Sequence, residues 1–313
     1  MNLQPLASKA APVKRIHLQE QLTLSGHRKA IYALGFNPDG GAIAAAGGDG
    51  VIKVWAAADG AELLSWPGHN SLIYALDFSP DGRYLATASF DDSIKLWEAH
   101  SGELLAVLPG HWGGVTAVAF SPDGRLLASG SGMSSIRVWR VSDGRALRTL
   151  DGHNSRVNSL RFSPDGLWLA SGASDGEIWL WDTQNQFSGM KLKGHKRNVH
   201  AIDFSGDGRF LASASQDTNL KLWELPSGRL SVTMSDYNEG LHAVAFSPDS
   251  TSIAVASYCY IKIWSSISTD RLAAVKGHQA WVNALRFSPD GLFLASASAD
   301  KLIKLWLLEP DIV

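Results

Sequence analysis

The chain has 313 residues, of which 45% are hydrophobic and 19% charged, and its 28 basic and 30 acidic residues leave a formal net charge of −2. This balance excludes the strongly basic surface that nucleic-acid backbones and anionic membranes attract, so we expect neither as a principal partner. The hydrophobic fraction is that of a globular chain with a sizeable core.

The N-terminal segment, residues 1–17, reads MNLQPLASKAAPVKRIH and lacks a continuous apolar stretch. No run of 18 apolar residues occurs anywhere in the sequence, so we expect a soluble protein that is neither exported nor inserted in a membrane, most simply a cytoplasmic one. Cys259 is the only cysteine, which excludes an internal disulfide and a cysteine-rich zinc site. We expect this residue to fill a small space in the core.

One motif then returns seven times along the chain. A phenylalanine before a Pro-Asp-Gly type of turn recurs in steps of 42 residues, with a last step of 41, at Phe36, Phe78, Phe120, Phe162, Phe204, Phe246 and Phe287. Gly-His begins ten residues before six of these positions, and a tryptophan closes each unit, at Trp55, Trp97, Trp139, Trp181, Trp223, Trp264 and Trp306. Repetition at this period marks an array of similar structural units.

Each unit carries the signals of short strands separated by tight turns. In the third unit, VTAVAF (115–120) and LLASGS (126–131) flank Pro-Asp-Gly, SIRVW (135–139) follows a second polar turn, and ALRTL (146–150) precedes the next Gly-His. These segments predict four strands per unit. We find no ten-residue amphipathic pattern of the helical period.

A repeat with Gly-His near its start and tryptophan near its end resembles the WD40 family, and the resemblance covers residues 20–308. Only Trp181-Asp182 keeps the literal Trp-Asp pair. The resemblance implies an all-β fold, a seven-bladed β-propeller of four-stranded antiparallel blades around a central channel.

The last unit lacks a fourth strand, whereas QEQLTLSG (19–26) resembles the fourth strands elsewhere. We therefore expect this N-terminal strand to pair with the last blade and close the ring. Residues 1–17 would then form a tail, and residues 18–313 the propeller.

Ser171, His153 and Asp175 lie close in sequence and raise the possibility of a hydrolase triad. A triad would occur once, beside an oxyanion site, but this constellation recurs in four units. The resemblance implies instead buried hydrogen-bonded tetrads that brace each blade, linking indole to hydroxyl, hydroxyl to imidazole and imidazole to carboxylate. The complete sets are His69, Thr87, Asp91 and Trp97; His153, Ser171, Asp175 and Trp181; His195, Ser213, Asp217 and Trp223; and His278, Ser296, Asp300 and Trp306.

Three units depart from this pattern. Unit one has Ala45 at the hydroxyl position, and unit three has Met133 at the aspartate position. Unit six has Tyr237 in place of the histidine and Val255 in place of the hydroxyl. Because all its polar partners are lost together, we expect unit six to depend on apolar packing and to form the weakest blade.

The resemblance also implies which positions face the narrower end of the channel. These mouth positions lie six and four residues before the repeat phenylalanine and one residue before the turn aspartate. In this sequence they are rich in rings, which are favoured anchors for a partner, although rings can also simply pack on loops. The residues that we expect to bind a partner are Tyr32, Tyr74, Phe90, Arg156, Asn158, His200, His242, Tyr258, Trp281 and Asn283.

A metal site at His200 and His242 is disfavoured, because the pair has no carboxylate companion among the mouth positions. We therefore predict a non-enzymatic scaffold, without cofactor or metal, that binds a protein or peptide partner at the channel mouth and takes part in a multiprotein complex. Two alternatives stay open: a propeller enzyme of the hydrolase or lyase type, and a sensor or targeting module of a larger protein.

Overall fold

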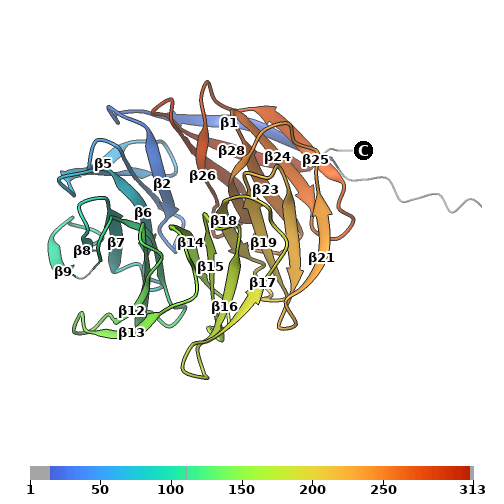
Figure 1. The fold of residues 1–313 in the computed structure, drawn as a ribbon. Helices are drawn as coiled ribbons and strands as arrows, with labels where there is room; N and C mark the ends of the chain where they lie inside the picture. The colour runs from blue at the N-terminus through green and yellow to red at the C-terminus, as the bar shows by residue number, and fades with distance from the viewer. Residues whose placement is uncertain (1–14, 110, 311–313) are drawn as a thin grey trace, which may run out of the picture.

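The computed structural model describes residues 15–109 and 111–310, and in that part of the chain 28 strands form seven four-stranded antiparallel sheets (Figure 1). The sheets stand as blades around a central channel, which confirms the predicted seven-bladed propeller. We number the blades one to seven in chain order. The described residues include no helix that could cross a membrane.

The first four blades each contain four consecutive strands, given from the channel outward. They are β2 (Ile31–Phe36), β3 (Ala42–Gly47), β4 (Val51–Ala56) and β5 (Glu62–Pro67); β6 (Ile73–Phe78), β7 (Tyr84–Ser89), β8 (Ile94–Glu98) and β9 (Leu104–Leu108); β10 (Val115–Phe120), β11 (Leu126–Ser131), β12 (Ile136–Arg140) and β13 (Ala146–Leu150); and β14 (Val157–Phe162), β15 (Trp168–Ala173), β16 (Ile178–Asp182) and β17 (Ser188–Leu192).

Blades five and six follow the same order, and blade seven takes its outermost strand from the N-terminus. These strands are β18 (Val199–Phe204), β19 (Phe210–Ser215), β20 (Leu220–Glu224) and β21 (Arg229–Met234); β22 (Leu241–Phe246), β23 (Ser252–Ser257), β24 (Tyr260–Ser265) and β25 (Arg271–Lys276); and β26 (Val282–Phe287), β27 (Phe293–Ser298), β28 (Ile303–Pro310) and β1 (Ile16–Leu24).

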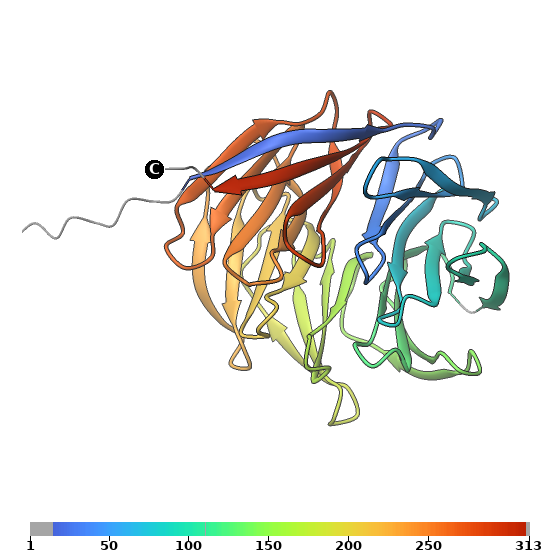
Figure 2. The same ribbon diagram turned by 180° about the vertical axis from the view of Figure 1, so that it is seen from behind.

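The ring closes where β1 pairs antiparallel with β28, and Figure 2 shows the two strands side by side at the edge of the molecule. The pairing runs from Ile16 opposite Pro310 to Leu24 opposite Ile303, which confirms the expected closure. The strand starts earlier than expected, because the extended end of β28 offers partners to Ile16 and His17 as well. These two residues therefore belong to blade seven and not to the tail, and residues 1–14 lie outside the described part.

The core lies between the blades. In the described residues, buried apolar side chains form seven clusters, each drawn from two neighbouring blades. The second strand of each blade is buried on both faces and is built mainly from Ala, Ser, Gly and aliphatic residues. A Cβ on Gly130 would lie 2.6 Å from Val157 Cγ1, and one on Gly172 would lie 2.7 Å from Val199 Cγ1. Small residues therefore set how closely adjacent blades approach.

The turns between the first and second strands follow one design. In blade two, Ser79 Oγ donates to Asp81 Oδ1 at 2.6 Å, and Gly82 has a φ of 70°, a left-handed conformation that favours glycine. Blade five has Gly206 where most units have proline. A Cβ at this position would lie 2.3 Å from the backbone oxygen of Pro248 in the next blade, so the close approach requires glycine.

Candidate functional site

The complete tetrads form continuous hydrogen-bonded chains inside their blades. In blade four, Trp181 Nε1 donates to Ser171 Oγ at 2.9 Å, and Ser171 Oγ lies 2.8 Å from His153 Nε2. His153 Nδ1 lies 3.1 Å from Asp175 Oδ2, and because the carboxylate only accepts, Nδ1 carries the proton and Nε2 accepts from the serine. Ser171 is completely buried. The geometry is that of an internal brace with no surface at which the hydroxyl could meet a substrate.

The same three contacts recur in blades two, five and seven. In those blades the hydroxyl lies 2.7–2.8 Å from histidine Nε2 and accepts the indole N–H at 2.8–2.9 Å. Histidine Nδ1 lies 2.9–3.1 Å from the aspartate oxygens. Burial lowers the pKa of each of these histidines although the aspartate opposes it, which keeps the ring neutral. The participating residues are His69, Thr87, Asp91 and Trp97; His195, Ser213, Asp217 and Trp223; and His278, Ser296, Asp300 and Trp306.

Blades one and three have incomplete braces. In blade one, where Ala45 offers no hydroxyl, His27 Nε2 is buried and finds no hydrogen-bond partner within the described chain. In blade three, His111 Nε2 keeps its contact with Ser129 Oγ at 2.7 Å, while Met133 points to solvent and Ser135 Oγ lies 3.3 Å from Nδ1. Burial, reinforced by the charge of Arg137, lowers the pKa of His111 to about 4.

Blade six corrects an expectation from the sequence. Its tryptophan, Trp264, donates from Nε1 to the hydroxyl of Tyr237 at 2.6 Å, so the blade is not held by apolar packing alone. The phenol reaches the indole from the histidine position and replaces both the histidine and the missing hydroxyl at Val255. Burial raises the pKa of Tyr237, which keeps the phenol protonated. Lys262 Nζ lies 4.4 Å from the centre of the phenol ring.

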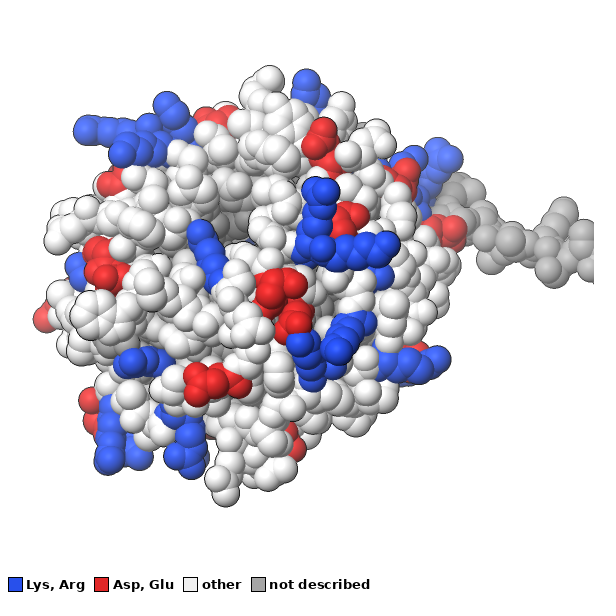
Figure 3. Space-filling model, in the orientation of Figure 1, with Lys and Arg blue, Asp and Glu red and all other residues white. Residues whose placement is uncertain are grey.

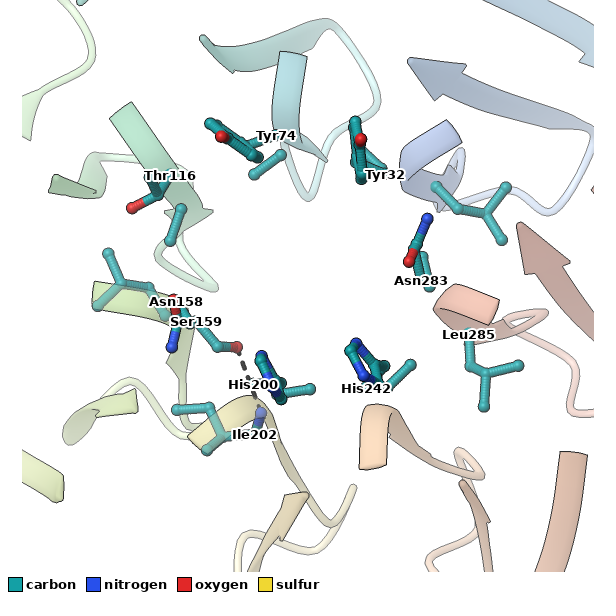
Figure 4. Close-up of a pocket in the computed structure, with 18 of the residues that line it drawn as sticks. Tyr32, Tyr74, Thr116, Asn158, Ser159, His200, Ile202, His242, Asn283 and Leu285 are labelled. Atoms are coloured by element: carbon teal, nitrogen blue, oxygen red, sulfur yellow. Dashed lines mark hydrogen bonds between the residues drawn. The ribbon is translucent and has the colours of Figure 1, made fainter. Parts of the chain in front are cut away.

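The channel mouth brings together one side chain from every blade. The position four residues before the repeat phenylalanine lies on each innermost strand, and Figure 4 shows these side chains around an open centre. All six expected partner-binding residues of the innermost strands therefore border the same opening, and Thr116 of blade three joins them. The seven residues are Tyr32, Tyr74, Thr116, Asn158, His200, His242 and Asn283.

Two sets of ring contacts border this opening. On blades one and two, the ring centres of Tyr32 and Tyr74 are 5.8 Å apart, and those of Tyr74 and Phe90 are 6.4 Å apart. Arg156, from the loop before β14, places its Cζ 4.2 Å from the centre of the Tyr74 ring. The guanidinium therefore lies over an aromatic face two blades away, an arrangement stabilised by cation–π attraction.

The second set is a ladder across blades five to seven. The rings of His200 and His242 stack with centres 4.5 Å apart and planes at 14°. Trp281 continues the ladder at 4.4 Å from His242, and Tyr258 meets Trp281 at 5.0 Å. Tyr258 and Trp281 are partly exposed, so the outer end of the ladder is open to solvent.

Asn158 and Asn283 have a structural contact that the sequence did not indicate. Asn158 Nδ2 donates to the backbone oxygen of Val199 at 2.9 Å, and Asn283 Nδ2 donates to that of Ile31 at 2.8 Å. Each amide thus ties the innermost strand of its blade to that of the next. Partner binding by these two residues stays a prediction.

Two exposed apolar residues on this face were missed. Trp112 is 76% exposed and Met133 is 68% exposed, near Phe90, which is 54% exposed. A Cβ on Gly113 would lie 2.8 Å from Met133 Cγ, and one on Gly114 would lie 2.9 Å from Phe90 Cδ2, which places these loops together. A signal was available: the residue after Gly-His is Arg, Asn, Lys or Gln in the other units and tryptophan only here.

Deeper in the channel, the residue directly before the repeat phenylalanine carries charge in several blades. Asp77 Oδ2 accepts the N–H of Phe120 in the next blade at 2.8 Å. Burial raises the pKa of Asp77 to about 6, opposed by the charge of Arg161. Arg161 Nε lies 3.5 Å from Asp203 Oδ1. The acidic and basic side chains at this position therefore alternate around the channel.

Within the described ranges, the group that could offer three metal ligands is His153, Asp175 and Glu177, with donor atoms within 4.8 Å of one another. His153 and Asp175 are already bonded to each other in the brace of blade four, and Glu177 pairs with Lys191. These contacts give all three residues a structural role in blade four.

A family model described as WD40, WD domain, G-beta repeat, matches the chain seven times, at residues 18–56, 60–98, 102–140, 144–182, 187–224, 228–265 and 269–306.

Among curated proteins, Lissencephaly-1 homolog 1 of Paramecium tetraurelia is 45% identical over 49 residues, 16% of this chain and 12% of that protein. Apoptotic protease-activating factor 1 of Homo sapiens is 37% identical over 54 residues, 17% of this chain and 4% of that protein. Ribosome assembly protein 4 of Saccharomyces cerevisiae is 49% identical over 45 residues, 14% of this chain and 9% of that protein. Each match thus spans a small fraction of the relative, little more than one repeat.

Proposed function

We propose that this chain, which belongs to the WD40 family, is a non-enzymatic scaffold that binds a peptide or protein loop across the mouth of its central channel. WD40 propellers generally bind proteins or peptides and form complexes. The observation that carries the proposal is the run of rings around the mouth, from Tyr258 and Trp281 through His242 and His200 on one side, with Tyr74 and Phe90 on the other.

The physical argument is that aromatic side chains bury much area at a small loss of conformational entropy. Here they sit on innermost strands and loops whose blades are braced internally, so little ordering remains to be done when a partner binds. Exposed Phe90, Trp112 and Met133 extend this apolar surface, and contiguous exposed apolar patches commonly mark interaction sites.

Affinity purification from the source cell tests the proposal with three forms of the protein: wild type, a Tyr74→Ala, Trp281→Ala double variant, and an Ile267→Ala, Leu292→Ala control. Ile267 and Leu292 are exposed in turns at the other end of the blades, so the control also removes two exposed apolar side chains. We expect the mouth variant alone to lose a partner. Equal recovery by all three forms would rule out this face.

An enzymatic alternative would need a reactive group that a substrate can reach. The recurring hydroxyl and histidine side chains are buried in four blades, which supports bracing over catalysis. A broad screen for hydrolase and lyase turnover decides the matter. Turnover that disappears in Ser171→Ala while the fold stays intact would replace the scaffold proposal with an enzyme.

We also propose that the protein acts in the cytoplasm and that neither nucleic acid nor a membrane surface is its principal partner. The near-neutral charge and the lack of a long apolar run support this. On the face seen in Figure 3, basic and acidic side chains are interspersed and do not gather into a patch of one sign. Fractionation of the source cell, followed by detection of the native protein, tests the location.

A further inference from the structure

We propose that the part of the partner that enters the channel mouth carries a carboxylate, and that the guanidinium of Arg156 receives it. This inference rests on the proposed function, which leaves the chemistry of the partner open. It names an acidic side chain or a chain-terminal carboxylate, flanked by apolar residues, as the recognised element.

The position of Arg156 is the first observation. The residue precedes β14 in blade four, yet its guanidinium lies over Tyr74 in blade two. It spans blade three, whose mouth positions are the small residues Gly114, Thr116 and Gly132. The lack of large side chains at these three positions leaves room for the Arg156 side chain to pass blade three and reach Tyr74.

The second observation is that this cation has no acceptor. Across residues 15–109 and 111–310, the Arg156 side chain makes no hydrogen bond or ion pair, and its Nε atom is buried without a partner. A guanidinium stays charged and offers five N–H donors, and a buried donor left unpaired is costly. A carboxylate matches the planar fork of these donors and can accept two hydrogen bonds at once.

The surroundings favour an anion over a cation. No mouth position holds Asp or Glu. Asp92 borders the mouth on blade two, and its Oδ1 already accepts the N–H of Gly114 at 2.5 Å. The aromatic face of Tyr74 is already covered by Arg156. Besides burial, the charge of Arg156 contributes to the lowered pKa of His200 on the neighbouring blade five. A second cation placed close to the guanidinium would be repelled by its charge.

Small-molecule probes test the carboxylate directly, with 3-phenylpropionate, 3-phenylpropionamide and 3-phenylpropylammonium sharing one ring and differing in the polar group. NMR of the tryptophan indole N–H signals follows binding. We expect 3-phenylpropionate to shift the Trp281 signal saturably and to bind at least about tenfold more tightly than the amide, as loss of a charged hydrogen-bonded pair predicts. The ammonium compound should bind most weakly.

Two variants separate the role of Arg156 from general positive charge. Arg156→Gln should abolish the preference for the carboxylate, whereas Arg28→Gln, which removes an exposed arginine from the corresponding loop of blade one, should keep it. Thermal unfolding of each variant verifies the fold. Equal binding of carboxylate and amide, an unchanged preference in Arg156→Gln, or no saturable shift with any probe would overturn the inference.

Selection from a peptide display library then distinguishes this inference from the proposed function. We expect selected peptides to contain Asp, Glu or a free C-terminus beside apolar residues and to lose binding to Arg156→Gln. If the selected peptides are basic and need Tyr74 and Trp281 for binding, the carboxylate inference is wrong and the scaffold proposal is supported. Peptides that bind independently of Tyr74 and Trp281 would overturn both.

Discussion

Trp264 in blade six donates its indole N–H to the hydroxyl of Tyr237 at 2.6 Å, and this single bond takes the place of the serine and histidine contacts of the complete tetrads. Tyr237→Phe keeps the ring and leaves a buried indole donor unpaired, so we expect a loss of about 1–3 kcal/mol in the free energy of unfolding, measured in denaturant. Tyr260→Phe, which removes an exposed hydroxyl in the same blade, is the control and should cost little. Equal losses would show that the bond contributes nothing.

Blade one offers the opposite change, because His27 Nε2 is buried and lacks a hydrogen-bond partner within the described residues. Ala45→Thr supplies the hydroxyl found at Thr87 in blade two, and Ala45→Val supplies the same volume without it. We expect the threonine variant to exceed the valine variant by about 1 kcal/mol in unfolding free energy, the usual value of one buried hydrogen bond. Valine as stable as threonine would contradict the role given to the hydroxyl.

In blade three, Met133→Asp restores the carboxylate opposite His111. The new acceptor should raise the pKa of His111 from its present value of about 4, because an adjacent negative charge favours the imidazolium. NMR titration of the ring measures this change, and thermal unfolding should move to higher temperature. Met133→Ala removes the exposed side chain without adding an acceptor and should leave the pKa unchanged. A similar pKa in both variants would contradict the prediction.

Asp77 predicts a dependence of stability on pH. Its pKa is raised from 3.8 to about 6 in the folded state, so between these values the folded state binds more protons than the unfolded state, and stability falls as pH rises. Asp77→Asn removes this effect while keeping an oxygen for the N–H of Phe120. We expect the stability of the variant relative to wild type to increase from pH 4 to pH 7 by at most about 3 kcal/mol.

Unfolding curves in denaturant at several pH values measure the effect of Asp77. Asp81→Asn is the control with the opposite sign, because the hydrogen bond from Ser79 is the largest cause of the lowered pKa of Asp81. The stability that this carboxylate contributes is present at neutral pH and is lost on acidification through its folded-state pKa. A stability difference for Asp77→Asn that stays constant with pH would contradict the burial of an ionisable group at this position.

The repeat made much of the fold predictable from sequence. Seven tryptophans at the same position of each repeat predict seven blades, and the missing fourth strand of the last unit predicts the pairing of β1 with β28. The tetrads were predictable for the same reason, since each residue type sits at a fixed offset within its unit. The start of β1 at Ile16 could not be predicted from the sequence, because it depends on how far β28 extends.

Contacts that depend on the path of a loop or that cross between blades were not predictable. Whether Tyr237 can reach Trp264 depends on the path of a loop. The sequence alone shows only that the histidine and the hydroxyl residue of this unit are replaced, which suggests that its polar contacts are lost. The reach of Arg156 to Tyr74 depends on small residues in the blade between them, which no periodicity reveals. The same holds for Asp77 and Phe120, which meet only because adjacent innermost strands run side by side in the ring.

The pairing of Ile16 with Pro310 sets a condition on biosynthesis. β1 has no partner strand until β28 is synthesised, and the six sheets that lie between them in the chain can assemble in the interval. The final sheet joins the most distant parts of the described chain, so its formation carries the largest loop-closure cost and converts an open arc into a continuous ring.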